Sequence, residues 1–230
     1  SEESIRNVTE VLHSTFLSEG NVVKRFEEEL SNRLDLSNPV AVNSGTSALH
    51  LGLVVAGVKA GDEVILPAQT FVASGLSVLM QNAKPVFADI QLETGNIDPA
   101  SIRERITDKT KAIMPVHWGG YPCDMDEINA IAGEYNLKVI EDAAHALGAK
   151  YKSRAVGSLS EFTAFSFQAI KHLTTGDGGA LCCRAGEDER RARSLRWFGI
   201  DRANSKPSIL GEREFDLTEL GYKYHLNDLA

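Results

Sequence analysis

The chain has 230 residues, of which 43% are hydrophobic and 24% are charged, an ordinary balance for a globular protein with one large core. Its formal net charge of −8 argues against a general affinity for nucleic acid or for anionic membranes. No apolar stretch reaches the length of a membrane span and no signal peptide opens the chain, so we expect a cytoplasmic enzyme or binding protein.

Hydrophobic periodicity predicts a helical start and then an alternation of strands and helices. Asp124 and Glu127 have the spacing of a capping box ahead of one of these helices, and residues 202–213 are predicted to form a loop. The predicted helices are 5–17, 22–34, 46–56, 71–80, 128–135 and 187–197, and the predicted strands are 39–43, 63–66, 85–89, 112–116, 138–141, 162–167 and 179–183.

This order predicts one α/β domain over residues 1–230, with a mostly parallel central sheet and helices on both faces. Ligands of such sheets bind outside the carboxyl ends of the strands, so the residues that follow each strand are the candidates for a site. Three cysteines cannot form a disulfide framework, and we expect Cys182 and Cys183 to be reduced thiols in a buried strand.

The turn from Asn43 to Ser47 lies between a strand and a helix. Its small residues, Gly45 and Thr46 among them, allow main-chain N–H groups and hydroxyls to converge on an anion at the helix N-terminus. Taken alone, the same turn would be an ordinary helix cap.

The segment Glu141-Asp142-Ala143-Ala144-His145 places an acid at a strand end, followed by two small residues. That pattern suits a planar heteroaromatic ring whose nitrogen needs an anionic partner. A metal site built from Glu141, Asp142 and His145 is the alternative, but no second ligand cluster supports it.

Lys171 follows a third strand within a turn rich in glycine and threonine, where a lysine can be partly buried and reactive. Most lysines are solvated, and without its neighbours Lys171 would be assigned to the surface. Phe71 follows a strand and Pro67, where an aromatic ring can stack on a ligand or anchor the next helix. Neither a dinucleotide fingerprint nor a Walker A sequence occurs.

In this order the motifs resemble the DegT/StrS family of pyridoxal-phosphate (PLP)-dependent nucleotide-sugar aminotransferases, which have the type I aspartate aminotransferase fold. The resemblance covers nearly the whole chain and is carried by three segments in the correct order and spacing. They are SGTSAL at 44–49, EDAAHALG at 141–148 and SFQAIKHLTTGDGG at 166–179.

The resemblance implies that residues 1–230, with the helices of 1–36 included, are the PLP-binding large domain. It implies that Lys171 forms the Schiff base and moves protons, and that Asp142 pairs with the pyridinium nitrogen. Ala144 and Phe71 would lie against opposite ring faces, and His145 would contact the ring hydroxyl. The positions that match the phosphate-binding residues are Gly45, Thr46 and Ser166.

Two segments depart from the family pattern. The family commonly has Asn and Arg where this chain has Lys223 and His225, and in relatives that Asn reaches the cofactor phosphate of the partner subunit. The resemblance therefore implies a homodimer in which Lys223 makes this contact. Residues 117–120 read HWGG where relatives usually have HLYG, in a loop expected to shape the sugar pocket.

The implied activity is transfer of an amino group from an amino acid, by analogy glutamate, to a keto-sugar, by analogy nucleotide-linked, for polysaccharide or secondary-metabolite sugar synthesis. Alternatives are a PLP-dependent sugar dehydratase, in which histidine replaces the Schiff-base lysine, another type I enzyme that acts on amino acids, and a non-catalytic regulatory protein. Relatives continue into a smaller C-terminal domain that this chain lacks, and both of its ends look truncated.

Overall fold

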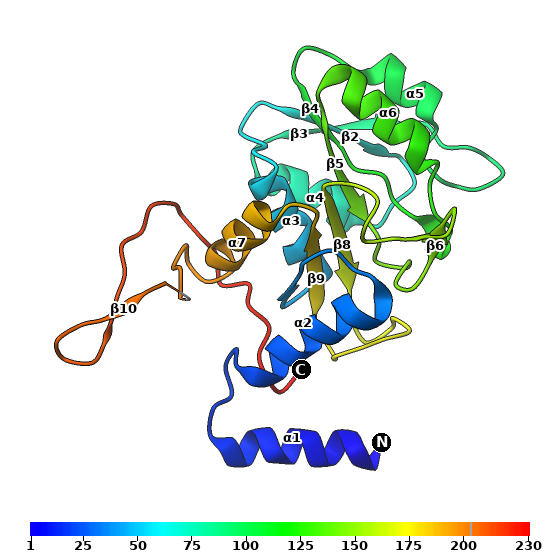
Figure 1. Cartoon of the computed structure of the whole chain (residues 1–230). Coiled ribbons are helices and arrows are strands. Elements are labelled where there is room, and N and C mark those ends of the chain that lie inside the picture. The colour runs from blue at the N-terminus through cyan, green and yellow to red at the C-terminus, as the bar shows by residue number, and fades with distance from the viewer. Residues whose placement is uncertain (203) are drawn as a thin grey trace.

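The computed structural model describes residues 1–202 and 204–230 and contains a seven-stranded sheet of order β1-β9-β8-β5-β4-β2-β3 (Figure 1). The helices are α1 (Glu2–Ser14), α2 (Asn21–Leu34), α3 (Gly45–Val55), α4 (Val72–Met80), α5 (Pro99–Arg105), η1 (Trp118–Gly120), α6 (Met125–Tyr135) and α7 (Gly186–Leu195). The strands are β1 (Pro39–Val42), β2 (Glu63–Pro67), β3 (Lys84–Ala88), β4 (Thr110–Ile113), β5 (Lys138–Asp142), β6 (Lys150–Tyr151), β7 (Arg154–Ala155), β8 (Phe162–Ser166), β9 (Gly179–Cys183), β10 (Lys206–Pro207) and β11 (Arg213–Glu214).

The sheet is mostly parallel, as the sequence predicts. The β3–β2, β2–β4, β4–β5 and β5–β8 pairs are parallel, whereas β9 runs antiparallel to both β8 and β1. Cys182 and Cys183 lie in β9 and are buried free thiols. Their strand is apolar throughout because helices cover both of its faces.

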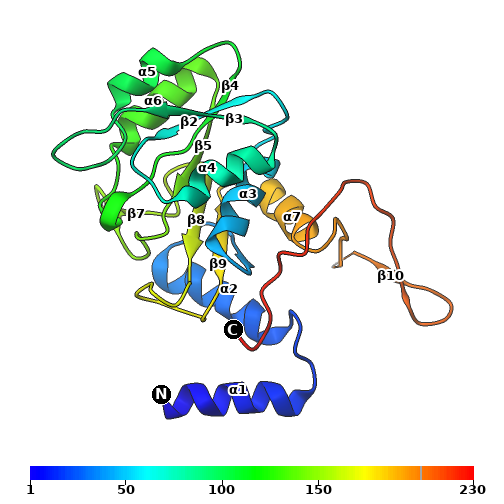
Figure 2. The same ribbon diagram turned by 180° about the vertical axis from the view of Figure 1, so that it is seen from behind.

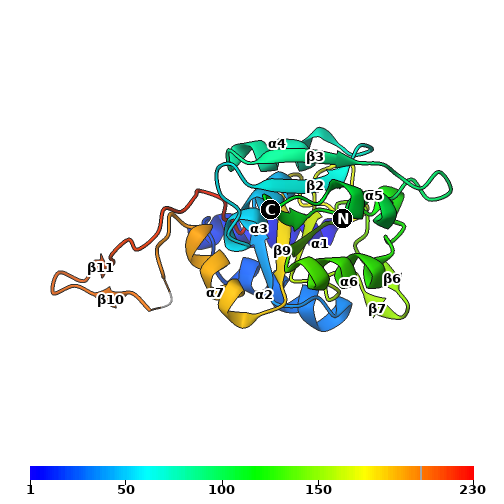
Figure 3. The ribbon, with the colours of Figure 1, turned by 90° about the horizontal axis from the view of Figure 1, so that it is seen from above.

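Helices cover the two faces of the sheet in separate groups (Figure 3). α3, α4 and α7 pack on one face, and α2, α5 and α6 pack on the other. The first core contains Leu49, Leu53, Val78 and Leu195, and the second contains Leu30, Ile102, Ile128 and Ile131, all nearly inaccessible to solvent. This double cover confirms the predicted α/β class.

Three examples show where the structure differs from the sequence prediction. α5 was not predicted, although Asp98 caps it by accepting from the Ala100 N–H (2.9 Å) and Pro99 opens it. The predicted 202–213 loop includes part of a short β10–β11 ladder, in which Lys206 pairs with Glu214. The predicted capping box is wrong in its side-chain contact, because Asp124 makes no side-chain cap and accepts from Gln91 Nε2 (2.9 Å) instead.

α1 and the β10–β11 segment project from the layered body (Figures 1 and 2). α1 buries only Val11, and it leaves Ile5 and Leu12 more than half exposed. Among the described residues, no helix has both the length and the apolar character needed to cross a bilayer.

The N-terminus of α2 is capped by a residue from the other end of the chain. Gly20 occupies the N-cap position and has no side chain to accept a hydrogen bond. Asp228 supplies the acceptor: its Oδ1 takes the N–H groups of Gly20 (2.9 Å) and Val23 (3.0 Å). Its carboxylate also opposes the positive end of the helix dipole. Residues 226–230 are thereby fastened to α2.

We therefore expect Asp228→Ala to lower the free energy of unfolding by about 1–2 kcal/mol, because it leaves two largely buried amides without an acceptor. Urea unfolding followed by circular dichroism measures the change. Asp124→Ala is the matched control, since Asp124 sits at the N-cap of α6 without capping it. Equal losses in the two variants would contradict the assigned cap.

Candidate active site

The carboxyl ends of β1, β2, β5 and β8 meet at one edge of the sheet, because these strands run in the same direction. β8 and β9 are joined at this edge by residues 167–178, the yellow loop near α2 in Figures 1 and 2. All four motifs that the sequence singled out follow one of these strand ends. The structure therefore brings the predicted segments to a common edge.

Asp142, the last residue of β5, is held by hydrogen bonds of both its main chain and its side chain. Its main-chain N–H donates to Pro115 O (2.8 Å), and its C=O accepts from His117 N (3.0 Å). The whole residue is only 6% exposed. Oδ2 accepts from Ser74 Oγ (2.7 Å), and Oδ1 accepts from Ala144 N (3.2 Å). A nearly buried carboxylate is thus held in one orientation at the site edge.

Gly45 and Ser166 form the base of an anion cradle. A Cβ built on Gly45 would lie 2.8 Å from Ser166 Cβ, so only glycine allows the helix N-terminus to come this close to the end of β8. Ser44 Oγ caps the Ser47 N–H at 3.0 Å. The N–H groups of Gly45 and Thr46 have no acceptor among the described residues, and they sit at the positive end of α3.

The GDGG segment packs behind this cradle. A Cβ on Gly179 would lie 2.6 Å from the main-chain carbon and oxygen of Ser44, so a side chain there would push the cradle out of place. This close approach explains why glycine is needed at the start of β9. The glycine at position 179 makes room for the turn that begins α3.

Lys171 lies in the loop between β8 and β9, which is tied down at several points. Phe167 N donates to Gly178 O (2.8 Å), and Lys171 N closes a turn on Gln168 O (2.9 Å). His172 Nε2 lies 3.0 Å from Leu147 O, which joins the loop to the segment after Asp142. The lysine is half-buried.

His145 lies within electrostatic reach of both Lys171 and Asp142. Partial burial lowers the pKa of His145, the positive charge of Lys171 lowers it further, and the negative charge of Asp142 opposes the shift. His145 is therefore neutral at pH 7 and keeps one ring nitrogen as an acceptor. The acid and the lysine that the sequence paired thus both act electrostatically on one histidine.

Ala144 and Phe71 also reach this edge. Ala144 is half-buried directly after Ala143, and it presents only a methyl group beside the Asp142 carboxylate. Phe71 is the N-cap residue of α4, the helix that carries Ser74, and it is 72% exposed. A large exposed ring beside a flat, uncrowded strand end is a surface on which a planar ligand can stack.

Lys223 has its backbone beside the cradle but its side chain outside it. Its main-chain oxygen accepts from Asn43 Nδ2 (3.2 Å), which places its backbone beside the cradle. Its ammonium group lies 3.8 Å from the centre of the Trp197 ring and is exposed. Within this chain the side chain thus lies on an indole ring outside the cradle.

Sequence reasoning missed a buried pair behind Asp142. His117 and Glu141 have fully buried side chains, with Nε2 and Oε2 2.8 Å apart, and Thr163 Oγ1 donates to Glu141 Oε1 (2.9 Å). Cys123 N donates to His117 Nδ1 (3.1 Å), so the ring proton lies on Nε2 and points at Glu141. Glu141 is a structural acceptor here. Within the described residues no group of three His, Cys, Asp or Glu side chains could hold a metal ion.

This fold is that of the PLP-dependent type I aminotransferases. The chain belongs to the DegT/DnrJ/EryC1/StrS aminotransferase family, which its sequence matches over residues 1–230. The family that the three motifs predicted is thereby confirmed.

Three relatives illustrate the similarity. Spore coat polysaccharide biosynthesis protein SpsC of Bacillus subtilis is 43% identical over 228 residues, which are 99% of this chain and 59% of that protein. GDP-perosamine synthase of Escherichia coli O157:H7 is 43% identical over 224 residues, 97% of this chain and 59% of the synthase. The crystal structure of NtdA from Bacillus subtilis with bound cofactor PMP has a TM-score of 0.90 at 33% identity and covers 99% of this chain and 50% of NtdA. The chain therefore spans about three fifths of the length of the curated relatives.

The buried pair gives a prediction for stability. Glu141→Ala leaves the His117 and Thr163 donors without an acceptor in the core, and we expect it to cost about 3–5 kcal/mol of unfolding free energy. Glu141→Gln keeps one side-chain oxygen and should cost less. Chemical denaturation measures both changes.

Asp126→Ala is the comparison, because Asp126 makes exposed ion pairs with Lys152 (2.8 Å) and Arg154 (2.7 Å). Such pairs contribute at most about 1 kcal/mol. A Glu141→Ala variant no less stable than Asp126→Ala would show that the buried pair does not hold this part of the core.

Proposed function

We propose that residues 1–230 are the cofactor-binding large domain of a PLP-dependent aminotransferase. It would move an amino group from an amino acid, glutamate by analogy, to a keto-sugar that is nucleotide-linked by analogy. One observation carries the proposal: Asp142 at the end of β5, the Lys171 loop after β8 and the Gly45–Ser166 cradle lie at the same edge of the sheet. A chain that belongs to this aminotransferase family and has these groups has the chemistry the reaction needs.

The residues at the edge fit the parts of the cofactor. The free N–H groups of Gly45 and Thr46 and the Ser166 hydroxyl suit a phosphate at a helix N-terminus. The oriented Asp142 carboxylate suits a protonated ring nitrogen. When bound, PLP supplies an electron sink that stabilises the negative charge left on carbon after a proton is removed.

The remaining groups bind and move protons. Lys171 would hold the cofactor covalently and, once released, carry a proton at Nζ between neighbouring atoms. The neutral ring of His145 can hydrogen-bond the ring hydroxyl of the cofactor. Ala144 and Phe71 would contact its two faces, the first because it is small and the second because it is flat and exposed.

A sugar substrate is supported by the relatives. SpsC is named for spore coat polysaccharide biosynthesis and GDP-perosamine synthase for a GDP-linked amino sugar. We therefore place this protein in the synthesis of amino sugars, for cell-surface polysaccharide or for secondary metabolites. Buried free thiols are consistent with the reducing cytoplasm, where we expect it to work.

We expect Lys171→Ala to abolish covalent retention of PLP and to lower transamination by at least about 10²- to 10⁴-fold, since no other amine replaces its proton transfer. Borohydride reduction followed by peptide mass spectrometry locates the linkage, and the visible absorbance of the holoenzyme reports it directly. Lys152→Ala, in an exposed turn, is the control. Full activity in Lys171→Ala would refute the proposal.

We further propose that the protein is a homodimer and that α4 lies in the interface. Val72, Leu76, Leu79 and Met80 fall on one side of this helix, and each is between 46% and 58% exposed. An apolar helix face of this kind normally packs against another surface. It begins next to Phe71, so a second copy bound there would also help to enclose the site.

Lys223 would then reach the cofactor phosphate of the partner subunit. Its backbone already borders the cradle through Asn43, and its ammonium group is exposed on Trp197 and free to turn outward. A lysine makes a charged contact with phosphate where the family commonly has a neutral asparagine.

We expect Leu76→Glu to shift the protein from dimer to monomer in sedimentation velocity and to weaken PLP binding, because a charge would be buried in the proposed interface. Leu92→Glu, at a 92% exposed position away from α4, should leave the assembly unchanged. A Leu76→Glu dimer of unaltered stability would exclude α4 from the interface.

A further inference from the structure

The Asp142 carboxylate receives a hydrogen bond from a helix that carries no family motif. Ser74 lies in the first turn of α4 and is 0% exposed. Its Oγ is 2.7 Å from Asp142 Oδ2. A carboxylate can only accept, so the serine proton is committed to this bond.

A second hydroxyl stands behind the first. Thr70 Oγ1 is 2.6 Å from Ser74 Oγ. Because Ser74 has already donated its proton, Thr70 must donate here, and its 3.3 Å contact with Phe71 O is not made at the same time. The direction of the chain is therefore fixed: Thr70 donates to Ser74, which donates to Asp142. Hydrogen bonds aligned in this way polarise and strengthen one another.

The Ser74 hydroxyl donates to Asp142 and not to the backbone of its own helix. α4 is an apolar helix, and a serine in its first turn ordinarily turns back to the helix backbone, as Ser77 does with Ser74 O at 2.8 Å. Ser74 instead crosses to the end of β5. Asp142 Oδ1 has only the weaker contact from Ala144 N (3.2 Å), so Ser74 supplies the shorter of its two bonds.

We propose that Ser74, supported by Thr70, is a positioning residue that holds the Asp142 carboxylate in the orientation in which it pairs with the cofactor ring nitrogen. This inference rests on the proposed function. The serine itself does not touch the reacting atoms; it acts through Asp142. α4 therefore links three features: the stacking surface at Phe71, the orientation of Asp142 and the apolar face proposed for the dimer.

The test measures PLP binding to the apoenzyme of Ser74→Ala and of Ser77→Ala. Both serines are 0% exposed in the same helix, but only Ser74 contacts Asp142. We expect Ser74→Ala to weaken PLP binding by about tenfold, the usual effect of losing a hydrogen bond to a charged group, and Ser77→Ala to leave it nearly unchanged. Thr70→Val should weaken it in the same direction by less, and it gives the answer if Ser74→Ala does not fold.

Two further measurements separate positioning from a general structural effect. The first repeats the titration with 1-deazapyridoxal phosphate, which lacks the ring nitrogen: Ser74→Ala should lose affinity for PLP but not for this analogue. The second adds Ser74→Ala to Asp142→Ala, where it should have no further effect. Equal losses for both ligands, or additive losses in the double variant, would overturn the inference. Wild-type protein that binds no PLP would instead overturn the proposed function.

Discussion

The structure depends on the immobilisation of one carboxylate at the end of a central strand. β5 lies in the middle of the sheet, between β4 and β8. The backbone of its last residue, Asp142, is bonded to Pro115 and His117 on the β4 side, and the next residue, Ala143, donates to Ala164 O of β8. Asp142 therefore cannot move without disturbing the sheet. Its side chain is then aimed by Ser74 on one face, while the neighbouring Glu141 anchors the opposite face through His117 and Thr163. Alternation along the strand gives one acid to the site and the other to the core.

The reversed strand β9 keeps Lys171 near that carboxylate. A parallel connection after β8 would have carried the chain across the sheet through a long crossover. Because β9 returns antiparallel beside β8, the twelve residues from 167 to 178 stay at the carboxyl edge. The return also brings Gly179 under Ser44, where the lack of a side chain lets the α3 turn approach Ser166. One change of strand direction thus assembles both the lysine loop and the anion cradle.

Sequence patterns predicted the parts of the fold that depend on local periodicity. The strands of the large sheet and most helices were predicted because each has an apolar run of the right period. α5 was missed because it is short and its only large apolar residue is Ile102. Contacts between distant segments could not be predicted. The Asp228 side chain caps α2 across more than 200 residues, and the Asp124 carboxylate accepts a hydrogen bond from Gln91 and not from its own helix. For the site, motifs indicated Asp142, Lys171 and Gly45, but nothing local in the α4 sequence indicates that Ser74 points at Asp142.

The segment 221–225 shows how its departures from the family pattern fit together. Tyr222 and Tyr224 stack on each other and pack against His50, which fixes which side of this extended segment faces α3. Lys223 and His225 must then face the other way, and both contact Trp197. The Lys223 ammonium lies 3.8 Å from the ring centre, and the centres of the His225 and Trp197 rings are 4.0 Å apart.

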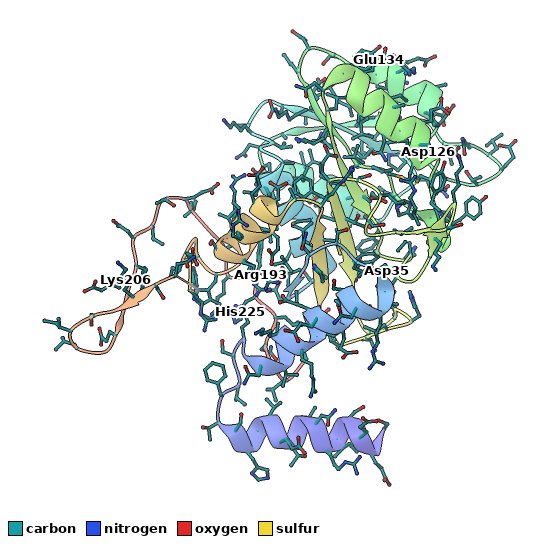
Figure 4. All side chains as sticks on the ribbon, viewed as in Figure 1. Asp35, Asp126, Glu134, Arg193, Lys206 and His225 are labelled. Atoms are coloured by element: carbon teal, nitrogen blue, oxygen red, sulfur yellow. The ribbon has the colours of Figure 1, made fainter. Side chains whose placement is uncertain are left out.

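Burial and the charges of Lys223, Arg196 and Arg202 lower the pKa of His225 to about 4, so it is neutral at pH 7 and adds no charge to this cationic cluster. Figure 4 labels His225 and also Arg193, which forms an ion pair with Glu27 of α2. The Trp197 ring already has two cations over it, Lys223 at 3.8 Å and Arg202 at 4.7 Å from its centre, so a neutral histidine at position 225 contacts the same indole without adding a third positive charge.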